Sequence, residues 1–270
     1  MACRLPNDPA SDPSARPSPV GTATIAITGW GFGPRSLQPL AEALAPGFPT
    51  QVLAPASLAG AGGDAQAPSP GGRFADGLAR RIAGLERPPV LIGWSLGALI
   101  ALETALLAPQ NVAALVLIGA TARFTRAPGY PPGTPARLLE AMIARLEEQP
   151  QAVVGDFIGR VFQPENVEEP ERRTLEATAL HLGATELTRG LRYLADTDLR
   201  ADLGRIGCPA LILHGDQDRI IPVAAAEFLR HGLPASSLKI IGGAGHALPL
   251  RQAGKIGAPI LAFLRGLPQA

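Results

Sequence analysis

The segment that most constrains this chain is Gly93-Trp94-Ser95-Leu96-Gly97. It follows an apolar run at 89–92 and precedes a run suited to a helix at 98–103. A G-x-S-x-G pattern between a strand and a helix is typical of a nucleophile elbow, a tight turn that presents a serine hydroxyl at a helix N-terminus. Glycine suits the flanking positions because a Cβ there would clash. The pattern predicts Ser95 as a nucleophile, against the alternative of a glycine-rich turn with an incidental serine.

Composition narrows the class of protein. A chain of 270 residues can form one large α/β domain, or such a domain with a small insertion. Apolar residues make up 46% of it, as in ordinary globular proteins. The formal net charge of +1 argues against a dedicated nucleic-acid binder, so no nucleic-acid partner is expected.

The first twenty residues differ from the rest of the sequence. Residues 1–20 combine five prolines with serine and aspartate and lack the apolar core of a secretory signal. We interpret them as a disordered tail. Because no apolar run reaches about 18 residues, we expect no transmembrane helix and no membrane partner. These features predict a cytoplasmic protein, and we expect it to be a monomer.

The two cysteines do not suggest a structural disulfide or a metal site. Cys3 falls in the predicted tail, and Cys208 precedes a predicted buried strand. We interpret Cys208 as a small buried hydrophobic residue. No CxxC motif or Cys/His cluster is present in the sequence, so we expect no metal and no other cofactor.

Strand and helix patterns alternate along most of the chain, which favours a mostly parallel sheet flanked by helices. Strands are expected at 23–28, 51–54, 89–92, 112–118, 210–213 and 238–241, and helices at 36–45, 73–85, 96–107, 222–230 and 251–265. Residues 121–205 break the alternation with a proline-rich stretch and three or four helical patterns. We predict an α/β-hydrolase fold with its core at 21–120 and 206–270 and a helical cap at 121–205.

A serine nucleophile needs a base, and in this fold the base follows the acid in chain order. Of the four histidines, only His246 lies in a glycine-rich loop after the last predicted strand, so it is the predicted base. His214 ends a strand and is interpreted as structural. His181 is interpreted as a solvated helix position that could instead line a pocket, and His231 as a contact at a helix C-terminus.

Two carboxylates follow the strand at 210–213, and we assign them different roles. Asp218 lies four residues before Pro222, the expected start of the next helix, and is the predicted partner of the base. Asp216 lies closer to the strand and is expected to fix the loop through backbone hydrogen bonds.

The oxyanion hole needs two N–H donors. Leu96, directly after the nucleophile, supplies one, and the loop after the strand at 23–28 should supply the other, most naturally from Trp30. The segment 29–33 lacks the G-x-G-x-x-G spacing of a dinucleotide loop. The predicted mechanism is attack of Ser95 on an ester carbonyl, followed by hydrolysis of the acyl-enzyme, with His246 as base in both steps.

Three segments resemble the pimeloyl-[acyl-carrier protein] methyl ester esterases of biotin synthesis. They are Gly-Trp-Gly at 29–31, Gly-Trp-Ser-Leu-Gly at 93–97, and Leu-Arg-Tyr-Leu-Ala-Asp-Thr-Asp-Leu-Arg at 191–200. The resemblance extends from residue 23 to about residue 265. The catalytic pattern is general to α/β hydrolases, whereas the two tryptophans and the segment 191–200 are more particular to this family.

The resemblance implies hydrolysis of a methyl ester on a pimeloyl chain carried by acyl-carrier protein. Trp30, Ser95, Leu96 and His246 would contact the acyl end. The matching aromatic residue of the cap would be Phe157, for which a core position in the second cap helix is equally open. Acyl-carrier protein as a partner rests on this resemblance alone.

The resemblance is incomplete in two respects. Thr28 stands where the family usually has histidine, a difference expected to affect packing beneath the oxyanion loop more than the chemistry. A basic cap should steer an acidic carrier, but residues 121–205 hold 11 arginines against 13 acidic residues. A basic patch would depend on arrangement, and its candidates are Arg137, Arg145, Arg160, Arg189 and Arg192. Solvated helix faces are the alternative for each.

Two other functions stay open. The first is hydrolysis of a small-molecule ester, a lactone or a C–C bond on the same fold, because the fold alone does not define the substrate. The second is a catalytically silent protein that binds a ligand or partner.

Overall fold

Six short strands form one sheet at the centre of the protein. The computed structural model describes residues 23–58 and 72–268, so the predicted tail at 1–20 lies outside the described residues. The strands are β1 (Thr24–Ile27), β2 (Thr50–Leu53), β3 (Val90–Trp94), β4 (Ala114–Ile118), β5 (Ala210–Gly215) and β6 (Ser236–Ile241). They lie in the order β2-β1-β3-β4-β5-β6, and each neighbouring pair is parallel. The predicted α/β-hydrolase fold with a parallel sheet is confirmed.

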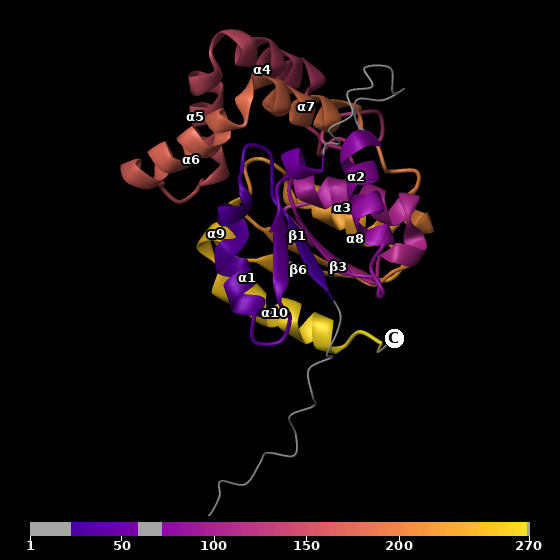
Figure 1. Ribbon diagram of the computed structural model, residues 1–270. Coiled ribbons are helices and arrows are strands. Elements are labelled where there is room, and N and C mark those ends of the chain that lie inside the picture. The colour runs from indigo at the N-terminus through magenta and orange to yellow at the C-terminus, as the bar shows by residue number, and fades with distance from the viewer. Residues whose placement is uncertain (1–22, 59–71, 269–270) are drawn as a thin grey trace, which may run out of the picture.

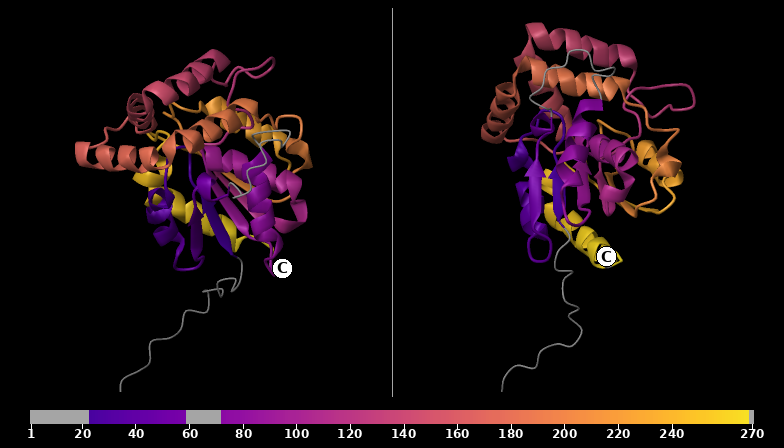
Figure 2. Two further views of the ribbon diagram at one scale, coloured as in Figure 1. Left: turned by 45° about the horizontal axis from the view of Figure 1, so that its top comes forward. Right: turned by 45° about the vertical axis from the view of Figure 1, so that its right-hand side comes forward.

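Helices cover both faces of the sheet. Around it lie η1 (Pro34–Leu37), α1 (Gln38–Leu44), η2 (Pro55–Ser57), α2 (Gly72–Ala83), α3 (Leu96–Leu107), η3 (Pro109–Asn111), η4 (Leu203–Arg205), α8 (Val223–Gly232), α9 (Leu248–Arg251) and α10 (Ala253–Arg265). Figures 1 and 2 show α1 and α10 on one face and α2, α3 and α8 on the other. Because helices pack on both faces of the sheet, β3 and β4 are continuous apolar runs in which every residue is buried.

Helix α3 follows the central strand β3 and is apolar around nearly its whole circumference. Nine of its residues are buried, because it packs against β3 on one side and α2 on the other. An α-helix without a polar face is stable only when it is enclosed in this way. The element that begins directly after Ser95 is therefore rigidly held.

Four helices lie above the carboxyl edge of the sheet, at the top of Figure 1. They are α4 (Ala136–Glu148), α5 (Pro150–Val161), α6 (Glu169–His181) and α7 (Gly183–Asp196), which we call the four-helix segment. Helix α4 packs against α7, and α5 packs against α6. Each helix buries one stripe, as the apolar spacing of Leu139, Ile143 and Leu146 in α4 predicts. The boundaries of a cap at 121–205 stay a prediction.

Two local predictions need correction. The helix expected at 251–265 begins two residues later, as α10 at Ala253, because Gln252 leaves the helical conformation at φ −130° and ψ 32°, and the short helix α9 before it was not expected. Cys208 is half-buried against the core rather than fully buried, and its thiol forms no disulfide among the described residues. None of the helices in residues 23–58 and 72–268 is long and apolar enough to cross a lipid bilayer.

Candidate active site

Ser95 occupies the sharp turn between β3 and α3. It is the one non-glycine residue with positive φ in the described chain, at φ 56° and ψ −117°. A Cβ on Gly93 would lie 2.3 Å from Cα of Ala98, and one on Gly97 would lie 2.2 Å from the Ile27 carbonyl oxygen. Glycine is therefore the only residue that fits on either side of Ser95. A strained, over-determined backbone at a serine is typical of a functional turn.

His246 and Asp218 form a buried pair. The Nδ1 atom of His246 lies 2.7 Å from Oδ2 of Asp218, and both side chains are 1% exposed. The other carboxylate oxygen, Oδ1, accepts hydrogen bonds from the backbone N–H groups of Ile220 and Ile221, each at 2.8 Å. The carboxylate is thus held by its own loop while it faces the imidazole.

The pair lies beside the turn that carries Ser95. The Ser95 N–H donates to the Ile118 carbonyl at 2.9 Å. The next residue, Gly119, is in contact with the pair, since a Cβ there would lie 3.1 Å from the His246 ring and 3.5 Å from Asp218. In addition, Nε1 of Trp94 donates to the His246 carbonyl at 2.9 Å. The three residues predicted as a catalytic triad therefore lie at the carboxyl edge of the sheet, after β3, β5 and β6.

Electrostatics keep the Asp218 carboxylate ionised. Burial alone would raise its pKa, but the charge and hydrogen bond of His246, the nearby His214 and the backbone N–H of Ile221 together lower the pKa below its ordinary value. An ionised carboxylate at Nδ1 fixes the imidazole tautomer that has its proton on Nδ1. In that tautomer Nε2 of His246 is a proton acceptor, and it is buried without a partner among the described residues.

The loop after β1 lies against the other side of the serine. A Cβ at Gly29 would lie 3.3 Å from the Ser95 Cβ. The buried Thr28 hydroxyl donates to the Phe32 carbonyl at 2.7 Å, and the Phe32 N–H donates to the Gly29 carbonyl at 3.3 Å. These two hydrogen bonds close the loop 28–32, which contains Trp30. Thr28 is thus part of the packing of the predicted oxyanion loop.

A cavity of about 300 Å³ connects Ser95 to the four-helix segment. It is lined by Trp30, Ser95, Phe124, Thr134, Leu138, Leu139, Ala141, Met142, Arg145, Val153, Asp156, Phe157, Arg160, Leu191, Leu194, Arg219 and Ile220. Its buried lining is apolar apart from Ser95. Its four charged side chains are exposed, as are Leu138 and Ala141, so these six residues lie at its open side, which we call the mouth. Phe157 packs edge-on against Trp30 at 4.8 Å between ring centroids. This mostly apolar lining suits an apolar group with its reactive end at Ser95.

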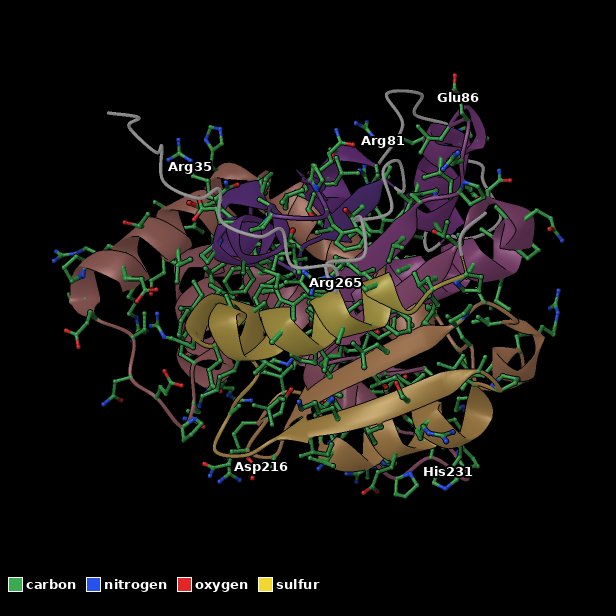
Figure 3. All side chains as sticks on the ribbon, turned by 90° about the horizontal axis from the view of Figure 1, so that it is seen from below. Arg35, Arg81, Glu86, Asp216, His231 and Arg265 are labelled. Carbon is green, nitrogen blue, oxygen red and sulfur yellow. The ribbon has the colours of Figure 1, made fainter. Side chains whose placement is uncertain are left out.

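The remaining predicted polar residues lie as follows. Asp216 accepts a hydrogen bond from the Gly243 N–H at 2.7 Å, which confirms its role in fixing the loop. His231 Nδ1 lies 2.7 Å from the Glu227 carbonyl, the predicted contact at the end of α8. Figure 3 shows Asp216 and His231 at the periphery of the molecule, and neither lines the cavity. His181 is exposed on α6 and is absent from the cavity lining.

The five arginines proposed as a basic patch do not share one environment. Arg145 and Arg160 line the cavity mouth. Arg189 is paired with Glu186 and Arg192 with Glu140, whereas Arg137 is exposed. Sequence reasoning missed Arg219, which follows Asp218 directly and lines the same mouth. Its position directly after Asp218, a predicted catalytic residue, could have indicated that it lies near the site.

The fold and this site define an enzyme of the α/β-hydrolase class. A family profile described as the alpha/beta hydrolase fold matches residues 76–251. An esterase from Exiguobacterium antarcticum superimposes with a TM-score of 0.77 at 21% identity, covering 92% of this chain and 94% of that one. A bromoperoxidase from Bacillus anthracis gives 0.81 at 20% identity, covering 91% and 92%. At these identities the two structures support the fold alone.

Sequence relatives are more particular. A pimeloyl-[acyl-carrier protein] methyl ester esterase from Aromatoleum aromaticum is 32% identical, covering 83% of this chain and 90% of the relative. One from Xanthomonas oryzae pv. oryzae is 30% identical, covering 92% and 97%. A biotin biosynthesis bifunctional protein from Cellvibrio japonicus is 29% identical over 91% of this chain, which spans only 48% of that longer protein. The chain belongs to the pimeloyl-[acyl-carrier protein] methyl ester esterase family and is a carboxylic ester hydrolase.

Proposed function

We propose that the protein hydrolyses the methyl ester of pimeloyl-[acyl-carrier protein] through a Ser-His-Asp acyl-enzyme mechanism. The observation that carries the proposal is the cavity, which joins Ser95 to an apolar lining and a charged mouth. Relatives named for this reaction match most of the chain, which supports the same substrate. The triad residues are Ser95, His246 and Asp218.

The proton path follows from the tautomer of His246. Its Nε2 takes the proton of Ser95 as the hydroxyl oxygen attacks the ester carbonyl, and then returns that proton to the methoxide leaving group as methanol departs. Water attacks the resulting acyl-enzyme with Nε2 again as the base. Asp218 stays ionised throughout and stabilises the imidazolium. The buried pair of 2.7 Å supports this division of roles.

Two backbone N–H groups would stabilise the oxyanion. Leu96 is the first residue of α3, where the helix dipole adds positive potential. The second donor is the backbone N–H of Trp30, in the loop that contacts Ser95 through Gly29. Loss of one such donor typically costs about 3 kcal/mol, or on the order of 100-fold to 1,000-fold in rate.

The mouth would receive the carrier. Arg145, Arg160 and Arg219 outnumber Asp156 there, so the entrance is basic although the helices above it are not basic overall. Arg145 lies 3.6 Å from Asp156, whereas neither of the other two arginines has an ion pair among the described residues. A basic mouth raises the association rate of an acidic partner, and salt weakens this effect.

Methanol release from pimeloyl-carrier methyl ester tests the proposal, with a free short-chain ester measured beside it. We expect turnover of both esters by the wild type and loss of both in Ser95→Ala. Arg219→Gln should raise KM for the carrier ester at low salt and leave the free ester unchanged. Arg173→Gln is the matched control, because Arg173 is exposed and does not line the cavity. Turnover of the free ester alone would exclude the carrier substrate and indicate a general esterase.

A further inference from the structure

The indole of Trp30 reaches from the loop after β1 into the four-helix segment. Its Nε1 donates to the carbonyl oxygen of Leu187 in α7 at 2.7 Å, and the bond is buried. The two residues lie 157 positions apart in the chain. A buried hydrogen bond of this length holds the indole in place, because breaking it would leave the Trp30 donor buried without a partner.

Helix α7 has a gap shaped for this indole. Gly190 is one turn beyond Leu187, and a Cβ there would lie 2.6 Å from Cδ1 of Trp30 and 3.2 Å from its Nε1. The backbone of Gly190 does not have a positive φ, so space rather than backbone conformation requires glycine at this position. The indole therefore packs directly on the bare backbone of α7.

The rest of the indole is enclosed as well. Phe157 of α5 packs edge-on against the ring, and Trp30 as a whole is 3% exposed. At the backbone end, the Thr28 hydroxyl closes the loop from residue 28 to residue 32. A short closed loop with a fixed side chain has little freedom left, so the position of the Trp30 backbone N–H follows from the position of its indole.

We propose that α7 positions the oxyanion hole, with the Leu187 carbonyl and Gly190 forming a seat for the Trp30 indole. This inference rests on the proposed function, in which the Trp30 backbone N–H binds the oxyanion. Leu187 and Gly190 act through Trp30 and are positioning residues. The four-helix segment thereby does two things: it encloses the acyl chain, and it completes the catalytic geometry.

Gly190→Ala tests the seat, and Gly159→Ala in α5 is the matched control because a Cβ at Gly159 meets no atom within 4 Å. The added methyl group must displace the indole or α7. A displacement of about 1 Å at a catalytic group can cost on the order of 100-fold in rate. We expect kcat for a short neutral ester to fall by about 10-fold to 100-fold in Gly190→Ala, with a smaller change in KM, and to stay within about 2-fold in the control.

Indole N–H signals in ¹H–¹⁵N spectra report the seat without any substrate. The chain has two tryptophans, so two signals are expected, and Trp30→Phe assigns them. In Gly190→Ala the Trp30 signal should shift and exchange faster with water, whereas the Trp94 signal should not change. A shifted Trp30 signal together with wild-type kcat would overturn the proposal.

A second variant covers the case in which Gly190→Ala does not fold. Trp30→Phe keeps a ring and the backbone N–H but removes the donor to Leu187, without adding volume. We expect its kcat to fall by about 10-fold, and wild-type kcat in this variant would overturn the proposal. Failure of the proposed serine mechanism, on which this inference rests, has a different signature: Ser95→Ala would then retain activity, whatever the state of the Trp30 signal.

Discussion

Nε2 of His214 lies 3.5 Å from Oδ2 of Asp218, the same oxygen that His246 approaches to 2.7 Å. His214 also donates this nitrogen's proton to the Ile221 carbonyl at 2.8 Å, since a carbonyl can only accept. The ring is fully buried at the end of β5. The prediction of a structural histidine is confirmed, since buried His214 supports the loop that carries the proposed catalytic carboxylate.

The first prediction concerns stability against pH. Burial lowers the pKa of His214 below 6.5, helped by the nearby charge of His246 and opposed by Asp218 and the Ile221 carbonyl. The unfolded chain therefore binds this proton at a higher pH than the folded chain. Between the folded pKa of His214 and its ordinary value, the unfolding free energy rises with pH. It therefore falls as the pH drops below about 6.5, by at most about 1.4 kcal/mol per pH unit.

Urea unfolding at a series of pH values between 7.5 and 5 measures this slope. We expect His214→Gln to have a shallower loss of unfolding free energy than the wild type over the upper part of that range. Asp218, whose pKa is lowered, contributes in the same direction but only at a more acidic pH, because its ordinary value is 3.8. An unchanged slope in His214→Gln would contradict the prediction.

The second prediction separates the two acidic residues after β5. Asp218→Asn should lower kcat by on the order of 10,000-fold, because an amide can stabilise the wrong tautomer of His246 and no longer neutralises the imidazolium. Asp216→Asn keeps an oxygen for the Gly243 N–H and should cost less than about 10-fold. Steady-state kinetics on a short ester compares them directly. Equal losses would mean that the assignment of Asp218 is wrong.

The third prediction concerns the loop that Thr28 closes. Thr28→Val keeps the shape of the side chain but leaves the Phe32 carbonyl without its donor, in a site where Thr28 is fully buried. We expect a loss of about 1–3 kcal/mol in unfolding free energy, together with reduced kcat as the oxyanion loop loosens. Thr28→Ser keeps the hydroxyl and should recover most of kcat. Equal kcat in the two variants would show that the hydrogen bond does not matter for catalysis.

Much of the site could be predicted because its determinants are local. The elbow at Ser95 can be predicted from five consecutive residues, because they include the two glycines that its tight turn requires. Asp218 and His246 could be found from chain order, because parallel strands bring the loops at their carboxyl ends to one edge of the sheet. The strands were predicted for a similar reason: strands covered on both faces are continuous apolar runs.

The contacts that sequence could not predict join distant segments. Nothing near Gly190 indicates that Trp30 packs on it, because the pairing depends on how α7 lies over the loop. The same holds for Arg219, whose side chain lines the same cavity as residues of α4 and α5. Local patterns set the elements, but the side-chain contacts between the four-helix segment and the sheet depend on tertiary packing.

The last prediction concerns a second connection between these two parts, at the loop of His246. The Ala247 N–H donates to the Val161 carbonyl of α5 at 3.0 Å. A Cβ at Gly245 would lie 1.8 Å from the Gln163 carbonyl oxygen, so the loop and the end of α5 are in backbone contact. Gly245→Ala must therefore move the residue next to His246. We expect kcat to fall by about 100-fold or more, because the base loses its alignment with Ser95.

Gly254→Ala is the matched control, since Gly254 lies in α10 and a Cβ there meets no atom within 4 Å. Gly254 lies in the first turn of α10, so alanine there should raise the unfolding free energy by less than about 1 kcal/mol and leave kcat unchanged. Circular dichroism and thermal unfolding establish whether Gly245→Ala is folded. A folded Gly245→Ala enzyme with wild-type kcat would show that the end of α5 does not position His246. A folded variant with depressed kcat and normal ester binding would assign that role to it.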